Sequence, residues 1–268
     1  MEKDNPLDIN FVSKLNKSKY YSSPFPHWVI KNFFSYEELE KIDKHFPTCQ
    51  EIINAVPIRK KNKVIKTQNS SYPIDFDELE NLNKDLSVLG SIANCWISQK
   101  QEVLDFLKKF DFAINLDQLI FDGNNVESRG DFRAATPAEI SGTTQLGPHL
   151  DKNFEILAGL IYLRKKEDNT VGGDLDLYKL KENVPQKYAS NRLRVPVRYL
   201  DKLKTIEYGN NSAVFFVSHP LAIHGVTPRA VGIYERRLIN FSLELDSAGS
   251  LKMYDTNKII DYSLAPKK

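Results

Sequence analysis

The stretch Glu155-Ile156-Leu157-Ala158-Gly159-Leu160-Ile161-Tyr162-Leu163 is an apolar run typical of a buried β-strand. It belongs to a series of short apolar segments, most of them separated by turn residues, at 116–121, 132–139, 155–163, 174–179, 212–217, 222–226 and 237–245. Short strands at this density predict antiparallel sheets packed as a jelly roll or a related double-sheet barrel.

The first part of the chain has a helical pattern instead. Ser35-Tyr36-Glu37-Glu38 has the spacing of a capping box and predicts a helix over residues 36–45. Residues 77–110 carry leucines at helical spacing, and Ser98-Gln99-Lys100-Gln101 has the spacing of a second capping box. Residues 24–30 predict a short extended segment, and the polar residues 1–22 an irregular arm. Helices followed by strands, without βαβ alternation, predict the α+β class.

Composition narrows the classes of partner. The chain has 268 residues, 41% hydrophobic and 27% charged, with a net charge of +2. Such a charge gives no reason to expect nucleic acid or an acidic membrane as a partner. No apolar run is long enough to span a bilayer, and the N-terminus has no apolar signal segment, so we expect a soluble, cytoplasmic protein.

Two histidines and a carboxylate form the candidate metal set. His149 and Asp151 are two positions apart, so their side chains leave the same face of an extended chain. His224 lies in a distant strand-like segment that must come alongside them. Two imidazoles and one carboxylate on one side of a metal suit non-haem Fe(II), although catalytic zinc sites use the same ligands. His219 is the alternative to His224 as the distal ligand, because Pro220 weakens the argument from alternation.

A basic pair opens the last predicted strand. A carboxylate co-substrate in a partly dry barrel needs a bidentate guanidinium partner. Arg236 and Arg237 point to opposite faces, and Arg236 shares its face with Asn240 and Ser242. We therefore favour Arg236 as the residue that lines the site.

These residues, in their order and spacing, resemble the prolyl-4-hydroxylase-like branch of the Fe(II)/2-oxoglutarate dioxygenases. The segments that carry the resemblance are His149-x-Asp151, Tyr162-Leu163, Gly172-Gly173-Asp174-Leu175-Asp176-Leu177-Tyr178, Asn211-Ser212-Ala213-Val214-Phe215-Phe216, His224-Gly225-Val226-Thr227-Pro228 and Arg236. The resemblance covers roughly residues 24–246 and is looser before residue 130.

The resemblance implies a double-stranded β-helix core with N-terminal supporting helices. It implies that His149, Asp151 and His224 bind Fe(II), with 2-oxoglutarate and O₂ as co-substrates. Arg236 would bind the distal carboxylate of 2-oxoglutarate, and Tyr162 would donate to the same carboxylate; the alternative for Tyr162 is a core aromatic. Because Asp151 is present where halogenating relatives have a small residue, hydroxylation of a small-molecule or peptide substrate is expected, with release of succinate and CO₂.

The expected organisation is one catalytic domain. It comprises an arm (1–22), a mainly helical supporting region (23–112), the β-helix core (113–246, with an insertion at about 179–208) and a C-terminal extension (247–268). The sequence departs from the branch in that insertion and in a slightly longer gap between His224 and Arg236. Two other interpretations stay open: a cupin-like metal-dependent hydrolase or isomerase using zinc or manganese, and a non-catalytic jelly-roll binding protein. The sequence does not predict the substrate or the oligomeric state.

Overall fold

The computed structural model describes residues 5–56, 71–110, 126–137, 147–151, 154–182, 195–218 and 221–245. The helices are α1 (Phe11–Asn16), α2 (Tyr36–His45), α3 (Cys49–Ala55), α5 (Ser87–Ser98) and α6 (Lys100–Leu107), with 3₁₀ turns at Phe76–Asn81 and Val197–Tyr199. The strands are β1 (Lys19–Tyr21), β2 (His27–Lys31), β3 (Ser71–Asp75), β4 (Val126–Ala135), β5 (Glu155–Leu163), β6 (Leu175–Leu180), β7 (Leu200–Ile206), β8 (Asn210–Val217), β9 (His224–Val226) and β10 (Arg236–Leu245).

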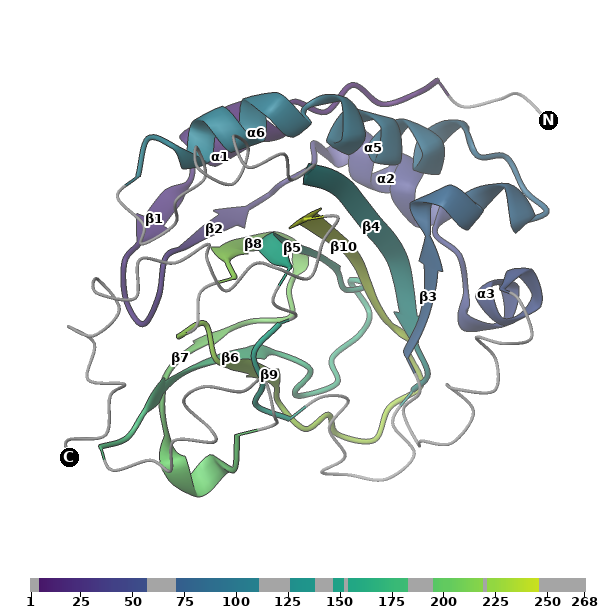
Figure 1. The fold of residues 1–268 in the computed structure, drawn as a ribbon. Helices are drawn as coiled ribbons and strands as arrows, with labels where there is room; N and C mark the ends of the chain where they lie inside the picture. The colour runs from purple at the N-terminus through teal and green to yellow at the C-terminus, as the bar shows by residue number, and fades with distance from the viewer. Residues whose placement is uncertain are drawn as a thin grey trace.

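The strands form two antiparallel sheets. The large sheet has the order β1-β2-β8-β5-β10-β4-β3, and the small sheet has the order β7-β6-β9. Figure 1 shows α1, α2, α5 and α6 on one face of the large sheet and the small sheet on its other face. The predicted α+β class and double-stranded β-helix core are confirmed, because strands far apart in sequence alternate between two facing sheets.

Strand β5 shows how the residues separate two cores. Its odd-numbered residues Leu157, Ile161 and Leu163 pack in the large core under the helices. Ala158 and Tyr162 pack in a second core between the sheets, whereas Ile156, near the start of the strand, packs in the large core. The alternation of side chains along a strand produces this division, so both faces of β5 are buried and the run is apolar throughout.

The helical predictions are confirmed in part. Helix α2 has the predicted bounds, and both hydrogen bonds of the Ser35–Glu38 capping box are present. The helical pattern expected over 77–110 is confirmed for α5 and α6, whereas its first part is a 3₁₀ turn followed by a non-helical segment. The second capping box is also wrong: Ser98 ends α5, and its hydroxyl donates to the Cys95 carbonyl (3.2 Å) instead of accepting from α6.

Several elements were not predicted. The supposed irregular arm contains α1, whose Phe11 and Leu15 are buried and whose first turn is capped by Asn10. Helix α3 and strand β3 were missed as well. Strand β7 lies inside the supposed insertion 179–208 but pairs with β6 along its length, so this part belongs to the small sheet.

Some predictions lie outside the described residues. They are the strand at 116–121, the end of the strand expected at 132–139, residues 183–194 of the insertion, and the extension 247–268. Strand β4 itself begins at Val126, earlier than expected, and ends at Ala135. Among the described residues, no helix has the length and hydropathy needed to cross a membrane.

Candidate metal centre

The structure brings His149, Asp151 and His224 together, as the sequence predicted. Their ligand atoms lie within 4.8 Å of one another. The Nε2 atoms of His149 and His224 are 3.6 and 3.5 Å from Oδ1 of Asp151. An isolated β-bridge between His149 and His224 holds the two segments in register, with backbone hydrogen bonds of 2.9 and 3.0 Å. Three potential ligand atoms therefore converge from two separate segments.

Backbone carbonyls orient both imidazoles. Nδ1 of His149 donates to the Gly147 carbonyl and Nδ1 of His224 to the Ala222 carbonyl, each at 2.9 Å. With Nδ1 protonated, each Nε2 carries a lone pair directed at the cluster, which is how metal-binding histidines are commonly held. Burial lowers the pKa of His224, an effect that Asp151 opposes, so the imidazole is kept neutral. A neutral imidazole is the form that binds a metal.

These three side chains could hold one divalent cation. Two nitrogen ligands and one oxygen ligand fit Fe(II), and the same set fits zinc. The alternative ligand, His219, lies outside the described residues. On its other side, the His224 ring contacts Phe216 of the core between the sheets (centroids 4.7 Å apart), so the cluster borders that core.

Arg236 is buried at the same core. Its residue is 3% exposed, and its Nε donates to the Gly173 carbonyl at 2.9 Å. The centre of its guanidinium lies 5.3 Å from the Tyr162 ring and 5.0 Å from the Tyr208 ring. Burial lowers the pKa of Arg236, although the two tyrosines act in the opposite direction. A buried cation of this kind is costly unless an anion meets it.

Tyr162 presents a polar atom without a partner. The residue is 0% exposed, and its hydroxyl makes no hydrogen bond to any described residue. Burial raises its pKa to about 12, while Arg236 acts in the opposite direction, so the hydroxyl stays protonated and can donate. Buried polar groups are rarely left unpaired, so this hydroxyl fits a site for an acceptor group of a ligand.

Arg237 points the other way. Its guanidinium forms an ion pair with Asp43 of α2, and its Nε donates to the Leu163 carbonyl at 3.1 Å. It lies over the Phe46 ring, beneath the helical layer. The structure therefore places Arg236 between the sheets and Arg237 against the helices.

A group of charged residues behind Arg236 was not predicted from the sequence. Arg229 is 4% exposed and forms an ion pair of 2.7 Å with Asp168, whose side chain is 1% exposed. The guanidiniums of Arg164 and Arg229 lie 5.7 and 5.8 Å from the ring of Tyr208, the ring that Arg236 also covers. The sequence did contain a signal for Arg229, because this residue directly follows His224-Gly225-Val226-Thr227-Pro228, the segment that contains the distal histidine.

The glycine pair Gly172-Gly173 forms a bend before β6. Gly172 and Gly173 have φ angles of +89° and +82°, a region that other residues rarely adopt. A side chain on Gly172 would also overlap the Pro228 carbonyl, since its Cβ would lie 1.9 Å from that oxygen. This close approach brings the Gly173 carbonyl within reach of Arg236.

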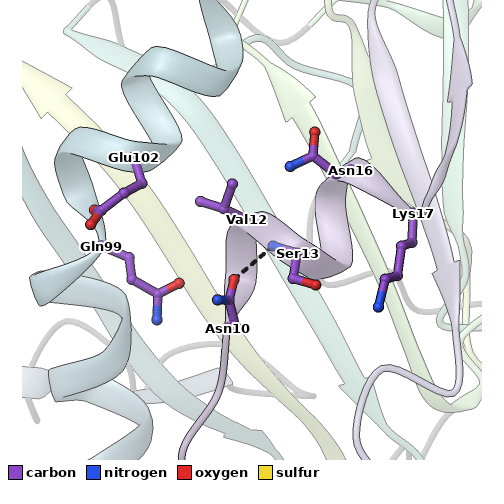
Figure 2. Close-up of a pocket in the computed structure, with 7 residues that line it drawn as sticks. All are labelled: Asn10, Val12, Ser13, Asn16, Lys17, Gln99 and Glu102. Atoms are coloured by element: carbon purple, nitrogen blue, oxygen red, sulfur yellow. Dashed lines mark hydrogen bonds between the residues drawn. The ribbon is translucent and has the colours of Figure 1, made fainter.

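A separate hollow lies on the helical layer, away from these residues. It is lined by Asn10, Val12, Ser13, Asn16, Lys17, Gln99 and Glu102, between α1 and α6 (Figure 2). Its lining shares no residue with the histidine cluster or with the surroundings of Arg236. Figure 2 marks a hydrogen bond in which the backbone N–H of Ser13 donates to Oδ1 of Asn10 (2.7 Å) and caps α1. We therefore assign this hollow no part in the metal centre.

Comparison with known proteins identifies the domain. Residues 136–244 match the family model described as the 2OG-Fe(II) oxygenase superfamily. This segment is a 2OG-Fe(II) oxygenase domain. The matched range contains His149, Asp151, His224 and Arg236, and the resemblance inferred from the sequence is confirmed. Proteins of this superfamily use Fe(II) and 2-oxoglutarate, and the matched segment holds the His149, Asp151 and His224 cluster.

Among the solved structures with similarity to this chain, one reaches a TM-score of 0.50. A putative oxygenase from Shewanella oneidensis is 11% identical, with a TM-score of 0.50, and the match covers 94% of this chain and 92% of that one. A prolyl 4-hydroxylase from Phytophthora capsici is 14% identical (TM-score 0.46), covering 88% of this chain and 65% of that one. A Pseudomonas putida prolyl-4-hydroxylase is 13% identical (TM-score 0.39), and the match covers 87% of this chain and 96% of that one. No curated protein sequence matches the chain.

Proposed function

We propose that the chain hydroxylates a C–H bond of a small-molecule or peptide substrate, with His149, Asp151 and His224 as the ligands of Fe(II). The observation that carries the proposal is the convergence of two Nε2 atoms and one carboxylate oxygen, with both Nδ1 atoms bonded to backbone carbonyls. Bound Fe(II) supplies the O₂ chemistry that couples decarboxylation of 2-oxoglutarate, to succinate and CO₂, with substrate oxidation.

Arg236 and Tyr162 are proposed to bind 2-oxoglutarate. The buried guanidinium would pair with the distal carboxylate, and the Tyr162 hydroxyl would donate to it. This assignment gives a partner to a buried cation and to a buried hydroxyl at once. The residues between the sheets would also exclude water from the co-substrate, because they form an apolar core around it.

The proposed organisation is a single catalytic domain. The helical layer supports the outer face of the large sheet, and the metal ligands come from the segment 147–151 and from β9 of the small sheet. The substrate would therefore reach the cluster from the side that the helices do not cover.

Release of succinate tests the proposal. Purified protein with Fe(II), ascorbate and 2-oxoglutarate should form succinate, and Asp151→Ala should reduce the rate at least about 100-fold because it removes a metal ligand. Asp201→Ala, on the exposed part of β7, is the matched control and should leave the rate unchanged. Normal turnover by Asp151→Ala would rule out the proposed ligand set.

A further inference from the structure

Arg133 lies on the same face of the large sheet as Arg236 and Tyr162. Residue pairs across the sheet place Arg133 of β4 opposite Leu238 of β10, and Leu238 opposite Tyr162 of β5. Directly paired residues on neighbouring strands share a face. Leu238 and Tyr162 belong to the core between the sheets, so Arg133 points to the side on which the metal ligands lie.

One edge of the Arg133 guanidinium is already occupied. Its Nε and Nη2 donate to the two carboxylate oxygens of Asp131, at 2.9 and 2.7 Å. Asn240 fixes that carboxylate further through a hydrogen bond of 3.1 Å from its Nδ2. A bidentate pair held in this way fixes the plane of the guanidinium.

The second edge is available. A guanidinium has five N–H donors, and the pair with Asp131 uses two of them. Within the described part of the chain, Nη1 of Arg133 donates to no residue. The Arg133 side chain is 33% exposed, whereas the Asp131 side chain is 8% exposed. The remaining Nη1–Nη2 edge can therefore donate to a second carboxylate that arrives from the solvent side.

The charge of Arg133 is coupled both to a metal ligand and to the buried arginine. Burial lowers the pKa of Arg133, but Asp131, then Asp75 and Asp151, raise it, and the net shift is upward. Arg133 in turn contributes to the lowered pKa of Arg236, after burial and Arg229. Arg133 therefore lies in electrostatic range of both Asp151 and Arg236.

We propose that the free edge of Arg133 binds a carboxylate of the primary substrate and orients it beside His149, Asp151 and His224. This inference rests on the proposed function and names the substrate class: a small molecule or peptide that carries a carboxylate. The difference in exposure separates this role from co-substrate binding. Arg236 is 3% exposed and suits the buried end of 2-oxoglutarate, whereas Arg133 is open to an arriving molecule.

Arg129 is a matched control on the same strand. It lies four residues before Arg133, on the same face, and pairs with Glu127 as Arg133 pairs with Asp131. Its side chain is 60% exposed and also lies 3.7 Å from Glu244. Arg129→Gln thus removes a similar ion pair without removing a guanidinium beside the metal ligands.

The experiment compares carboxylates with their primary amides as stimulators of 2-oxoglutarate turnover. The probes are the proteinogenic L-amino acids and a set of dipeptides, each with its C-terminal amide. We expect at least one carboxylate to stimulate succinate release with a kcat/KM at least about tenfold above that of its amide, as for other lost charged contacts. Arg133→Gln should abolish this preference and leave the KM for 2-oxoglutarate unchanged, while Arg129→Gln should keep the preference.

Because Arg133→Gln removes the cation that pairs with the buried Asp131, a double variant guards against misfolding. Asp131→Asn with Arg133→Gln removes both charges, and it should lose the preference while keeping its melting temperature shift with Mn(II). The inference is overturned if amides stimulate as well as acids, if no carboxylate probe stimulates, or if Arg133→Gln raises the KM for 2-oxoglutarate instead. Metal binding and basal succinate release separate these outcomes from failure of the proposed function, in which both would be absent.

Discussion

Tyr162 has a buried hydroxyl that the folded chain does not use. Replacing it with phenylalanine removes no hydrogen bond to a described residue, so we expect a change of less than about 1 kcal/mol in the free energy of unfolding. If the hydroxyl donates to 2-oxoglutarate, Tyr162→Phe should raise the KM for 2-oxoglutarate about tenfold, since a hydrogen bond to a charged group contributes about 1.5–3 kcal/mol. Urea denaturation and succinate release measure the two effects. An unchanged KM would favour the core-aromatic interpretation.

Substitutions of the neighbouring Arg236 and Arg237 should separate effects on co-substrate binding from effects on stability. Arg236→Lys keeps the charge but loses the planar fork, so we expect the KM for 2-oxoglutarate to rise at least about tenfold. Arg237→Lys weakens the pair with Asp43 and the bond to the Leu163 carbonyl, so it should lower the melting temperature and leave that KM nearly unchanged. The reverse pattern in the two variants would assign the co-substrate to Arg237.

At the scale of elements, a buried histidine joins the two sheets. His27 on β2 of the large sheet is 0% exposed; its Nδ1 donates to the Phe25 carbonyl (2.8 Å), and its Nε2 accepts from Lys204 of β7 (3.0 Å). Burial lowers the pKa of His27 to about 4, the Phe25 carbonyl opposes this, and Lys204 lowers it further. The contact between β2 and β7 therefore requires a neutral imidazole.

This histidine predicts a dependence of stability on pH. The unfolded chain binds a proton at His27 near pH 6.5, whereas the folded chain does so only near pH 4. The stability that depends on neutral His27 is therefore fully present above about pH 6.5. The free energy of unfolding falls by up to about 3 kcal/mol as the pH falls from 6.5 to 4. Urea denaturation at several pH values should show a steeper loss in the wild type than in His27→Gln. Equal slopes would contradict the assignment.

The elements that the sequence predicted are those with local signals. Helix α2 carries its own capping box, and β5 is apolar along its length because both of its faces are buried. The missed elements depend on distant contacts. Helix α1 has only six residues and is held by its buried side chains, and β7 is mostly exposed and is defined by its pairing with β6.

At the scale of the molecule, the site joins segments that no local pattern connects. The spacing of His149 and Asp151 predicted that their side chains share a face, and alternation predicted that Arg236 and Arg237 point to opposite faces. Arg133 and Asp131 were not predicted as part of it, because their place follows from the pairing of β4 with β10. Local periodicity gives the face of a strand, and only the sheet order says which strands share that face.

The whole site carries an excess of buried positive charge, which an anion should relieve. Arg164, Arg229 and Arg236 surround the Tyr208 ring, and Asp168 pairs with the first two of them, at 3.8 and 2.7 Å. Arg236 therefore faces the core without an ion pair to any carboxylate of the described residues. Burial lowers the pKa of its guanidinium. A dianion that reaches both Arg236 and a metal at His149, Asp151 and His224 would stabilise the fold as well as bind.

The buried positive charge at Arg236 predicts that metal and then co-substrate stabilise the protein in that order. Mn(II), used in place of Fe(II) to prevent turnover, should raise the melting temperature of the wild type but not of Asp151→Ala, which lacks a ligand. Addition of 2-oxoglutarate to the Mn(II)-loaded protein, at about 100 times its Kd, should add about 2.7 kcal/mol to the free energy of unfolding. Arg236→Gln should keep the response to Mn(II) and lose most of the response to 2-oxoglutarate. An equal 2-oxoglutarate response in Arg236→Gln would show that the buried positive charge is satisfied within the fold itself.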